Sequence, residues 1–212
     1  LQRLLSKKLG SLQVGFENAN RTPSYLLRNN SGFPVKAPAN GTHKENITHL
    51  FTTLNVPALQ LQLSGHYYLI GNYAYFKNFY EADQQTAPFN VLQIKGSKDF
   101  RISKFWHWYT DVAVQKTAGN TPVNIPLLYL RNRIVFQGQF FRNLNIALGL
   151  DSRYYTPYTA DNYSPVTGQF FPQDSIRIAN LPDIAAFVNF RIRSFSAFVR
   201  LENLNTLKLD GF

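Results

Sequence analysis

The chain of 212 residues contains no cysteine and no methionine, and it contains no long apolar run. Without cysteine there is no disulfide framework, no thiolate metal site and no cysteine nucleophile. No segment approaches the run of about 18 apolar residues that a membrane helix requires, which excludes a helical membrane protein. Because position 1 is not methionine and no signal-like segment is present, we expect the chain to be part of a longer protein.

Charged residues are also scarce, at 16%, whereas soluble domains contain about 25%. Aromatic residues are plentiful, with 18 phenylalanines and 12 tyrosines. The 22 lysines and arginines exceed the 12 acidic residues, giving a net charge of +10. Such an excess favours nucleic acid, lipopolysaccharide phosphates or anionic solutes as partners. No nucleic-acid-binding motif is present, so the last two fit better.

Polar and apolar residues alternate along many segments, as they do in strands with one apolar face. From Leu61 to Leu69, every second residue is apolar or glycine, and Gln62, Ser64 and His66 lie between them. The strictest alternation runs from Leu144 to Arg153. The period-two pattern predicts about nine strands, and residues 1–5 read as the end of another. The segment from Ile47 to Leu54 shows no clear alternation of polar and apolar residues.

Short and long connectors alternate between these segments. Short connectors are expected at 6–8, 55–57, 97–103, 139–143 and 193–194, and long ones at 19–44, 71–88, 116–125 and 156–180. Transmembrane β-barrels have short periplasmic turns and long extracellular loops. We therefore predict an all-β fold, an antiparallel up-and-down transmembrane β-barrel formed by one domain over residues 1–212. The barrel is expected to be incomplete, lacking N-terminal strands and a closing strand, because open edges are not tolerated in lipid.

The charged residues of the predicted strands fall opposite the apolar ladders, on the face that becomes the lumen of a barrel. The predicted basic pore-lining residues are Lys95, Arg131, Arg133, Arg153, Arg191 and Arg200. The acidic or polar lining comprises Asp111, Asp151, Asp183, Asn189 and Glu202. An aromatic girdle at the membrane interfaces is expected from Trp106, Trp108, Tyr67 and Tyr154. In a soluble ligand-binding β-barrel the same apolar ladders would fill the core, so the face pattern alone does not separate the two classes.

Candidates for catalysis or metal binding are weak. His107 and Asp111 share one face of a strand, and His66 lies on another, but such chemistry needs two or three groups that converge. His43 and His49 are expected to be solvated beside a loop. We therefore expect no enzyme activity, no catalytic residue, no metal and no cofactor. The aromatic run from Tyr67 to Tyr80 is read as interfacial belt and loop packing, with sugar stacking as the alternative.

Three stretches near the C-terminus resemble a known family. They are Tyr163–Phe171 (YSPVTGQFF), Leu181–Arg193 (LPDIAAFVNFRIR) and Ala197–Asn205 (AFVRLENLN). They are similar to the C-terminal part of the barrel in the Putative porin family of Bacteroidota outer membranes, and Gly10–Tyr25 is similar to an earlier hairpin. The resemblance implies a porin-type barrel in the bacterial outer membrane, with no catalytic residues to carry over.

The leading functional expectation is an outer-membrane porin that passes small hydrophilic, including anionic, solutes. The alternative is a plugged structural or accessory subunit of an outer-membrane transport or secretion complex. A soluble ligand-binding barrel is the second alternative, and it should purify without detergent. The expected partners are outer-membrane lipid and lipopolysaccharide, small solutes and other outer-membrane subunits.

Overall fold

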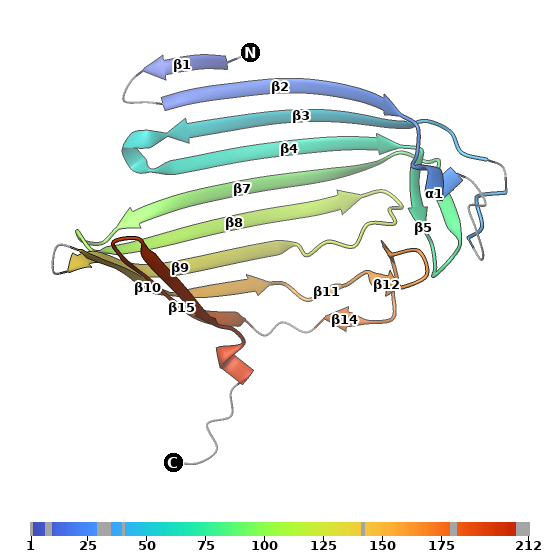
Figure 1. Cartoon of the computed structure of the whole chain (residues 1–212). Coiled ribbons are helices and arrows are strands. Elements are labelled where there is room, and N and C mark those ends of the chain that lie inside the picture. Colours follow the sequence, from blue (N-terminus) through green and yellow to red (C-terminus); the bar gives the residue numbers. More distant parts are fainter. Residues whose placement is uncertain are drawn as a thin grey trace.

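The computed structural model describes residues 2–6, 10–28, 35–39, 41–140, 143–178 and 182–206. Its main feature is a ten-stranded antiparallel sheet in which each strand pairs with the next sheet strand along the chain (Figure 1). The strands of this sheet, in spatial order, are β1 (Gln2–Ser6), β2 (Gly10–Arg21), β3 (Glu45–Val56), β4 (Leu61–Gly71), β7 (Phe89–Arg101), β8 (Trp106–Ala118), β9 (Leu128–Phe140), β10 (Leu144–Tyr155), β15 (Asp183–Ile192) and β16 (Phe195–Leu201).

Smaller elements occupy the connections. They are α1 (Tyr25–Arg28), β5 (Tyr73–Phe76), β6 (Ala82–Gln85), β11 (Tyr158–Thr159), β12 (Asn162–Ser164), β13 (Gln169–Phe171), β14 (Arg177–Ile178) and the 3-10 helices η1 (Pro57–Leu59) and η2 (Leu204–Thr206). β5 pairs with β6, β11 with β14 and β12 with β13. Within the described ranges, no helix has the length and apolar character needed to cross a bilayer.

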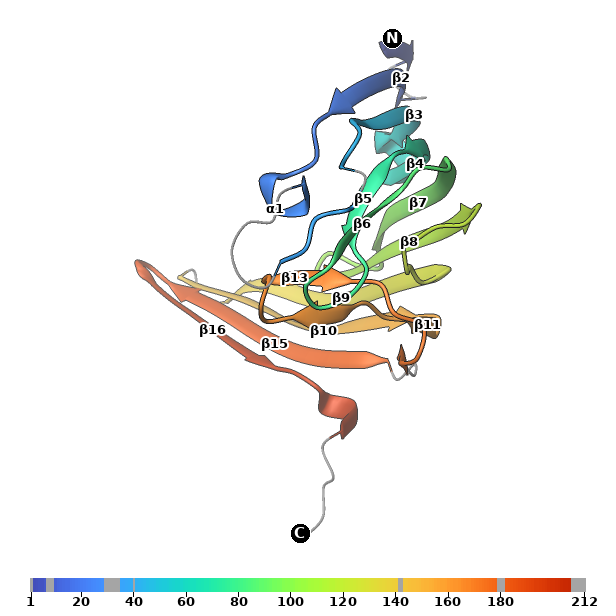
Figure 2. The same cartoon turned by 90° about the vertical axis from the view of Figure 1, so that its right-hand side faces the viewer.

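The sheet curves into an arc that does not close, since its spatial order begins at β1 and ends at β16 (Figure 2). The prediction of an antiparallel up-and-down arrangement is confirmed, as is its incompleteness. The nine expected strands correspond to β2 onward, and the tail at residues 1–5 is β1. The long strands contain 10 to 13 residues, and β16 contains 7. A transmembrane strand needs about 9–11 residues.

Short connectors lie at one end of the sheet and long loops at the other (Figure 1). Several strands extend past the expected boundaries. β7 extends to Arg101, so only residues 102–105 remain for the turn predicted at 97–103, and β2 and β8 extend to Arg21 and Ala118, into the connectors predicted from 19 and 116. Lys98 and Phe100 explain the extension of β7, since both stay on the outer face in register with Leu61 and Trp108. The long connection 156–182 contains β11 to β14 rather than an irregular loop.

The sequence of β3 does not alternate clearly, because both faces of this strand mix polar and apolar residues. His49 and Phe51 lie on the same face of β3, and their neighbours on β4 are Tyr68 and His66. The rings of His49 and Tyr68 stack at 4.2 Å between centroids with an interplanar angle of 5°. Thr48 and Thr52 occupy the other face. Aromatic stacking between strands therefore replaces the usual alternation here.

The long loops pack together into what we call the cap, formed by residues 22–28, 35–39, 41–44, 72–88 and 156–178. Val35, Phe76, Ala82 and Phe171 form its buried cluster, against which Leu26 and Leu27 pack. Phe79 contacts Phe171 edge to face at 4.8 Å. Figure 2 shows α1, the β5–β6 hairpin and β13 lying inside the arc of the sheet. The cap thus covers part of the mouth on the long-loop side.

Candidate functional site: the charged band of the concave face

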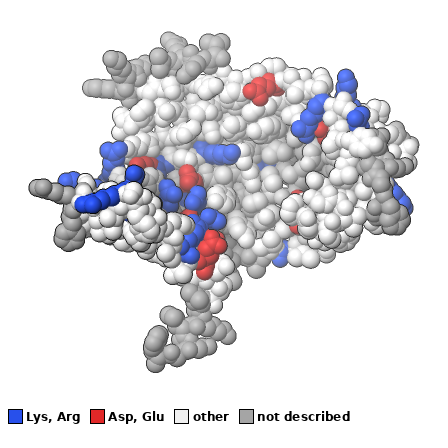
Figure 3. All heavy atoms as spheres, in the orientation of Figure 1, with Lys and Arg blue, Asp and Glu red and all other residues white. Residues whose placement is uncertain are grey.

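The concave face of the sheet carries most of the charged side chains of the long strands, whereas Lys98 of β7 lies on the outer face. Figure 3 shows basic and acidic side chains gathered on this face, most densely towards β15 and β16. The outer face is mainly apolar, and Val14, Leu92, Leu150 and Val188 are 43–51% exposed there. A sheet with a charged inner wall and an apolar outer wall matches the arrangement of an outer-membrane barrel.

Strand register brings the predicted lining residues into two rows. In the first, Asp111 on β8 faces Arg131 on β9, Arg131 faces Arg153 on β10, and Arg153 faces Asp183 on β15. In the second, Tyr109 faces Arg133, which faces Asp151. Side chains directly opposite each other on one face are close enough to interact. These rows place charges that are distant in sequence at one level of the wall.

Asp151 lies at the centre of this arrangement and is 1% exposed. Its carboxylate accepts hydrogen bonds from Arg131, from Nε at 2.9 Å and from Nη2 at 2.7 Å. Nη2 of Arg153 and Nη2 of Arg200 each lie 3.7 Å from Oδ2. The parallel pair from Arg131 is the bidentate geometry that makes such contacts strong. One buried carboxylate therefore joins guanidinium groups from β9, β10 and β16.

Two further carboxylates, Glu202 and Asp183, balance the charges of the arginines around Asp151. Arg200 donates from Nε to Glu202 at 2.8 Å, and Nη1 of Arg153 lies 3.9 Å from Asp183. We call Arg131, Arg153, Arg200, Asp151, Asp183 and Glu202 the charged band. Its three arginines and three carboxylates sum to zero formal charge. The band accordingly supplies strong local fields without a net positive potential.

Other predicted basic residues stand outside these ion pairs. Lys95, Arg133 and Arg191 make no ion pair with any described acidic residue. The guanidinium of Arg133 lies 4.8 Å from the Tyr109 ring centroid, and its buried Nε has no described hydrogen-bond partner. It borders a cavity of about 340 Å³ that Asp99 and Asp111 also line. The charges of these three side chains are therefore not neutralised by a described ion pair.

A hydrogen-bonded histidine chain crosses β2, β3 and β4, and the sequence did not reveal it. Glu17 Oε2 lies 3.4 Å from His49 Nδ1, His49 Nε2 lies 3.1 Å from His66 Nδ1, and His66 Nε2 lies 3.3 Å from Ser64 Oγ. His49 was expected beside a loop but lies within β3, with its side chain 16% exposed. Cross-strand pairing is the signal that could have revealed the contact, since His49 and His66 lie diagonally across the β3–β4 ladder.

The two histidine rings do not chelate a metal ion in this arrangement. Their centroids are 5.3 Å apart with an interplanar angle of 14°, so the 3.1 Å separation between nitrogens joins rings that meet edge to edge. Nitrogens that face each other along the line between the ring centroids form an N–H···N hydrogen bond, so they do not point at a common ion. Nor do the described residues contain any group of three or more metal-ligating side chains.

His107 and Asp111 share the concave face of β8, as expected, but no hydrogen bond joins them. His107 Nδ1 instead lies 3.4 Å from Asp99 Oδ1, on the neighbouring strand. Asn189, also predicted as lining, borders a shallow cavity with Arg191 on the concave side. No constellation of nucleophile, base and orienting group occurs among these residues.

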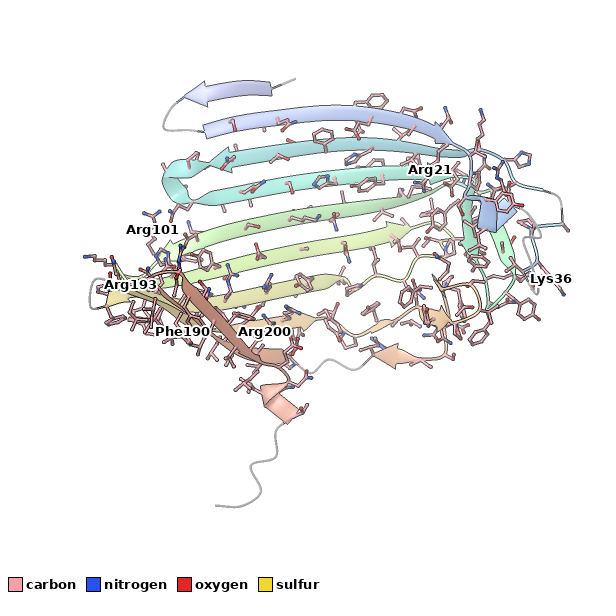
Figure 4. All side chains as sticks on the ribbon, in the orientation of Figure 1. Arg21, Lys36, Arg101, Phe190, Arg193 and Arg200 are labelled. Atoms are coloured by element: carbon pink, nitrogen blue, oxygen red, sulfur yellow. The ribbon has the colours of Figure 1, made fainter. Side chains whose placement is uncertain are left out.

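Aromatic residues surround the short-turn end on the outer face. Trp106 and Trp108 are 42% and 37% exposed, and Trp108 stacks on Phe100 at 4.9 Å. Figure 4 shows many side chains crowded at this end near Phe190. Tyr67 and Tyr154 lie on the outer face towards the long loops, opposite Leu92 and Leu130 respectively. In contrast, Phe76 from the predicted aromatic belt is buried in the cap.

The fold is shared with a solved copper transporter and a solved ferric enterobactin receptor. The copper transporter OprC aligns with a TM-score of 0.73 at 16% identity, and the alignment covers 96% of this chain and 32% of OprC. A variant of the ferric enterobactin receptor PfeA of Pseudomonas aeruginosa, in complex with enterobactin, aligns with a TM-score of 0.67 at 13% identity, covering 96% and 34%. No curated protein sequence matches this chain. The chain spans about one third of the length of these structures.

A match to the sequence model of a protein family provides stronger evidence than these structures do. The model, described as Putative porin, matches residues 2–211, which is nearly the whole chain. The match agrees with the partial barrel, its apolar outer face and its aromatic residues at the short-turn end. The chain therefore belongs to the Putative porin family and is an outer-membrane β-barrel protein.

Proposed function

We propose that the complete protein is a non-enzymatic porin that passes small hydrophilic solutes across the outer membrane along its concave face. The charged band carries this proposal, because six ionisable side chains on one wall are useful in a water-filled lumen and costly against lipid. The apolar outer face would contact lipid, and the cap would meet lipopolysaccharide on the cell surface. Nothing among the described side chains calls for a cofactor.

Further strands are required to close the pore. β1 and β16 each pair on one side only, so both leave a row of backbone donors and acceptors without partners in the sheet. Such edges do not occur in hydrocarbon. We propose that additional strands of the same polypeptide pair with both edges, and that residues 1–212 form one part of a larger single barrel domain.

We further propose that the pore prefers anions. The arginines of the charged band are neutralised, whereas Lys95, Arg133 and Arg191 retain their charges for the lumen. Rings of basic side chains favour anions in pores. We propose that these three residues, rather than the whole set of arginines, set the selectivity.

Conductance in planar bilayers tests this proposal. Replacing Lys95, Arg133 and Arg191 together with Gln should shift the reversal potential under a salt gradient towards cation preference. The matched control replaces Arg153 with Gln and Asp183 with Asn, which removes one pair without altering net charge, and should leave the reversal potential close to that of the wild type. An unshifted triple variant would contradict the assignment of selectivity to these residues.

A plugged structural or accessory subunit is the second candidate, and the cap favours it. Loops from three connections form the cap, and the β8–β9 connection joins it where Asn124 Nδ2 donates to the Gln173 carbonyl at 2.9 Å. A folded cap inside the arc reduces the opening on the extracellular side (Figure 2). The absence of any conductance from the complete wild-type protein would reject the open pore and support this candidate.

A further inference from the structure

The outer face of β8, β9 and β10 contains one polar row within an apolar surface. Thr110, Asn132 and Ser152 occupy consecutive cross-strand positions on these strands. The next row towards the short turns comprises Trp108, Ile134 and Leu150, and the next row towards the long loops comprises Val112, Leu130 and Tyr154. The polar row is thus bounded by apolar side chains towards the short turns and towards the long loops, and it continues on β7 with Lys98, which faces Thr110.

The row lies well inside the hydrocarbon region. Asn132 is four residues along β9 from Phe136, which contacts Trp106 at the short-turn end, with ring centroids 5.3 Å apart. Four residues at about 3.3 Å each, on a strand tilted by roughly 40°, correspond to about 10 Å of depth. The apolar band of such a barrel is about 25 Å tall, so Asn132 lies near its middle.

The hydrogen bonds of Asn132 determine the direction of its amide. Oδ1 accepts from Thr110 Oγ1 at 2.7 Å and from Trp108 Nε1 at 3.1 Å. An indole N–H can only donate, so the atom facing it must be the oxygen. The amide nitrogen then points away, and among the described residues it donates no hydrogen bond. Two N–H donors are left unused at a depth where lipid offers no acceptor.

An unpaired amide in hydrocarbon is unfavourable, and a partner surface at the same depth would relieve it. We propose that the row formed by Thr110, Asn132 and Ser152 is the interface between two copies of this protein, related by a two-fold axis along the membrane normal. In that arrangement the Asn132 amide of one copy donates to the hydroxyl oxygens of Thr110 or Ser152 of the other, and reciprocally.

A second copy fits this site better than another occupant. Two barrels inserted in the same direction place the same row at the same depth, so donors meet acceptors without further adjustment. The row contains both kinds of group, since Thr110 and Ser152 keep free hydroxyl lone pairs. Ile134 and Leu150, which are 42% and 51% exposed, would pack beside the hydrogen bonds and exclude lipid. An unrelated protein would need a matching polar group of its own at that depth.

Crosslinking in the membrane tests the proposal, and it does not depend on whether the pore conducts. Residues 1–212 contain no cysteine, so Ser152→Cys introduces a single reactive site there in a complete protein without cysteines elsewhere. A short bismaleimide should join two copies through Cys at position 152. The matched control, Leu92→Cys, places the thiol on the outer face of β7, away from the row, and should not crosslink.

Substitution of the amide completes the test. Asn132→Leu should still insert and show heat-modifiable migration, because leucine suits lipid, but its dimer dissociation constant in nanodiscs or detergent should rise at least tenfold. Thr52→Leu, on the outer face of β3, should leave dimerisation unchanged. A wild-type protein that is monomeric at all concentrations would overturn the proposal. So would equal crosslinking at positions 92 and 152, or crosslinking of position 152 to a different protein.

Discussion

Asp151 and Arg131, from adjacent strands, form a bidentate ion pair with distances of 2.9 and 2.7 Å on the concave wall. The carboxylate is 1% exposed, whereas the guanidinium side chain is 32% exposed. Arg153 and Arg200 approach the same carboxylate from two other strands. Asp151 is therefore the point through which β9, β10 and β16 are held together electrostatically.

Removing this carboxylate should strongly destabilise the barrel. Asp151→Asn leaves three arginines near each other without their shared counter-charge, and breaking a buried ion pair costs about 3–5 kcal/mol. The free energy of unfolding by urea, measured in liposomes, should fall by that amount. Asp183→Asn is the control, because its side chain is 37% exposed and such pairs contribute about 0–1 kcal/mol. Equal losses in the two variants would show that Asp151 has no special role.

The assignment of inner and outer faces can be tested on β10. Leu148→Arg places a charge on the outer face, which costs about 2–4 kcal/mol at the bilayer midplane. Ala147→Arg places the same charge on the concave side, beside Asn145 and Asn189, and should cost much less. The two variants are compared by their folding yields and their urea unfolding midpoints in liposomes. Gly149 does not serve as a control, since a Cβ there would approach the Ile134 carbonyl oxygen to 2.3 Å.

The stability of the cap should depend on its buried aromatic residue. Phe76 is 4% exposed, and its truncation to Ala should destabilise the cap by about 3–5 kcal/mol, because it leaves a cavity in the cluster with Val35 and Phe171. Limited proteolysis should then cut residues 72–88 faster in folded, membrane-inserted protein. Phe170→Ala, at a residue that is 66% exposed, is the control and should leave the rate near the wild-type value. Unchanged protection in the Phe76 variant would show that the cluster does not hold the cap.

Alkaline pH should loosen the cap through Tyr73. Burial raises the pKa of Tyr73 above its ordinary value of 10.0, and the carboxylates of Glu45 and Asp161 raise it further. Because the folded state favours the protonated phenol, its contribution to stability is complete below pH 10 and is lost as the pH rises through the raised value.

Tyr73→Phe should retain the edge-to-face contact with Phe89, where the centroids are 5.7 Å apart, and should resist this loss. Near-ultraviolet circular dichroism recorded against pH compares the two proteins, with tyrosinate absorbance as the measure of ionisation. If both lose their signal at the same pH, Tyr73 does not control the alkaline transition.

The sequence by itself determined which face of each regular strand is apolar. Successive side chains point to opposite sides of a strand, so the period-two pattern of Leu144 to Arg153 assigns Leu148 and Asp151 to opposite faces without knowledge of their neighbours. The alternation of short and long connectors gave the antiparallel order in the same way, because a tight turn can join only neighbouring antiparallel strands.

The tertiary structure alone decided which charges meet. Arg131, Asp151 and Arg200 are separated by 20 and 49 residues, and their contacts depend on strand register and on the curvature that brings β16 towards β10. The same holds for the contact between His49 and His66, and for the packing of Val35 on Phe76 in the cap. A strand pattern gives the direction of a side chain but not its neighbour, since the neighbour depends on pairing between distant segments.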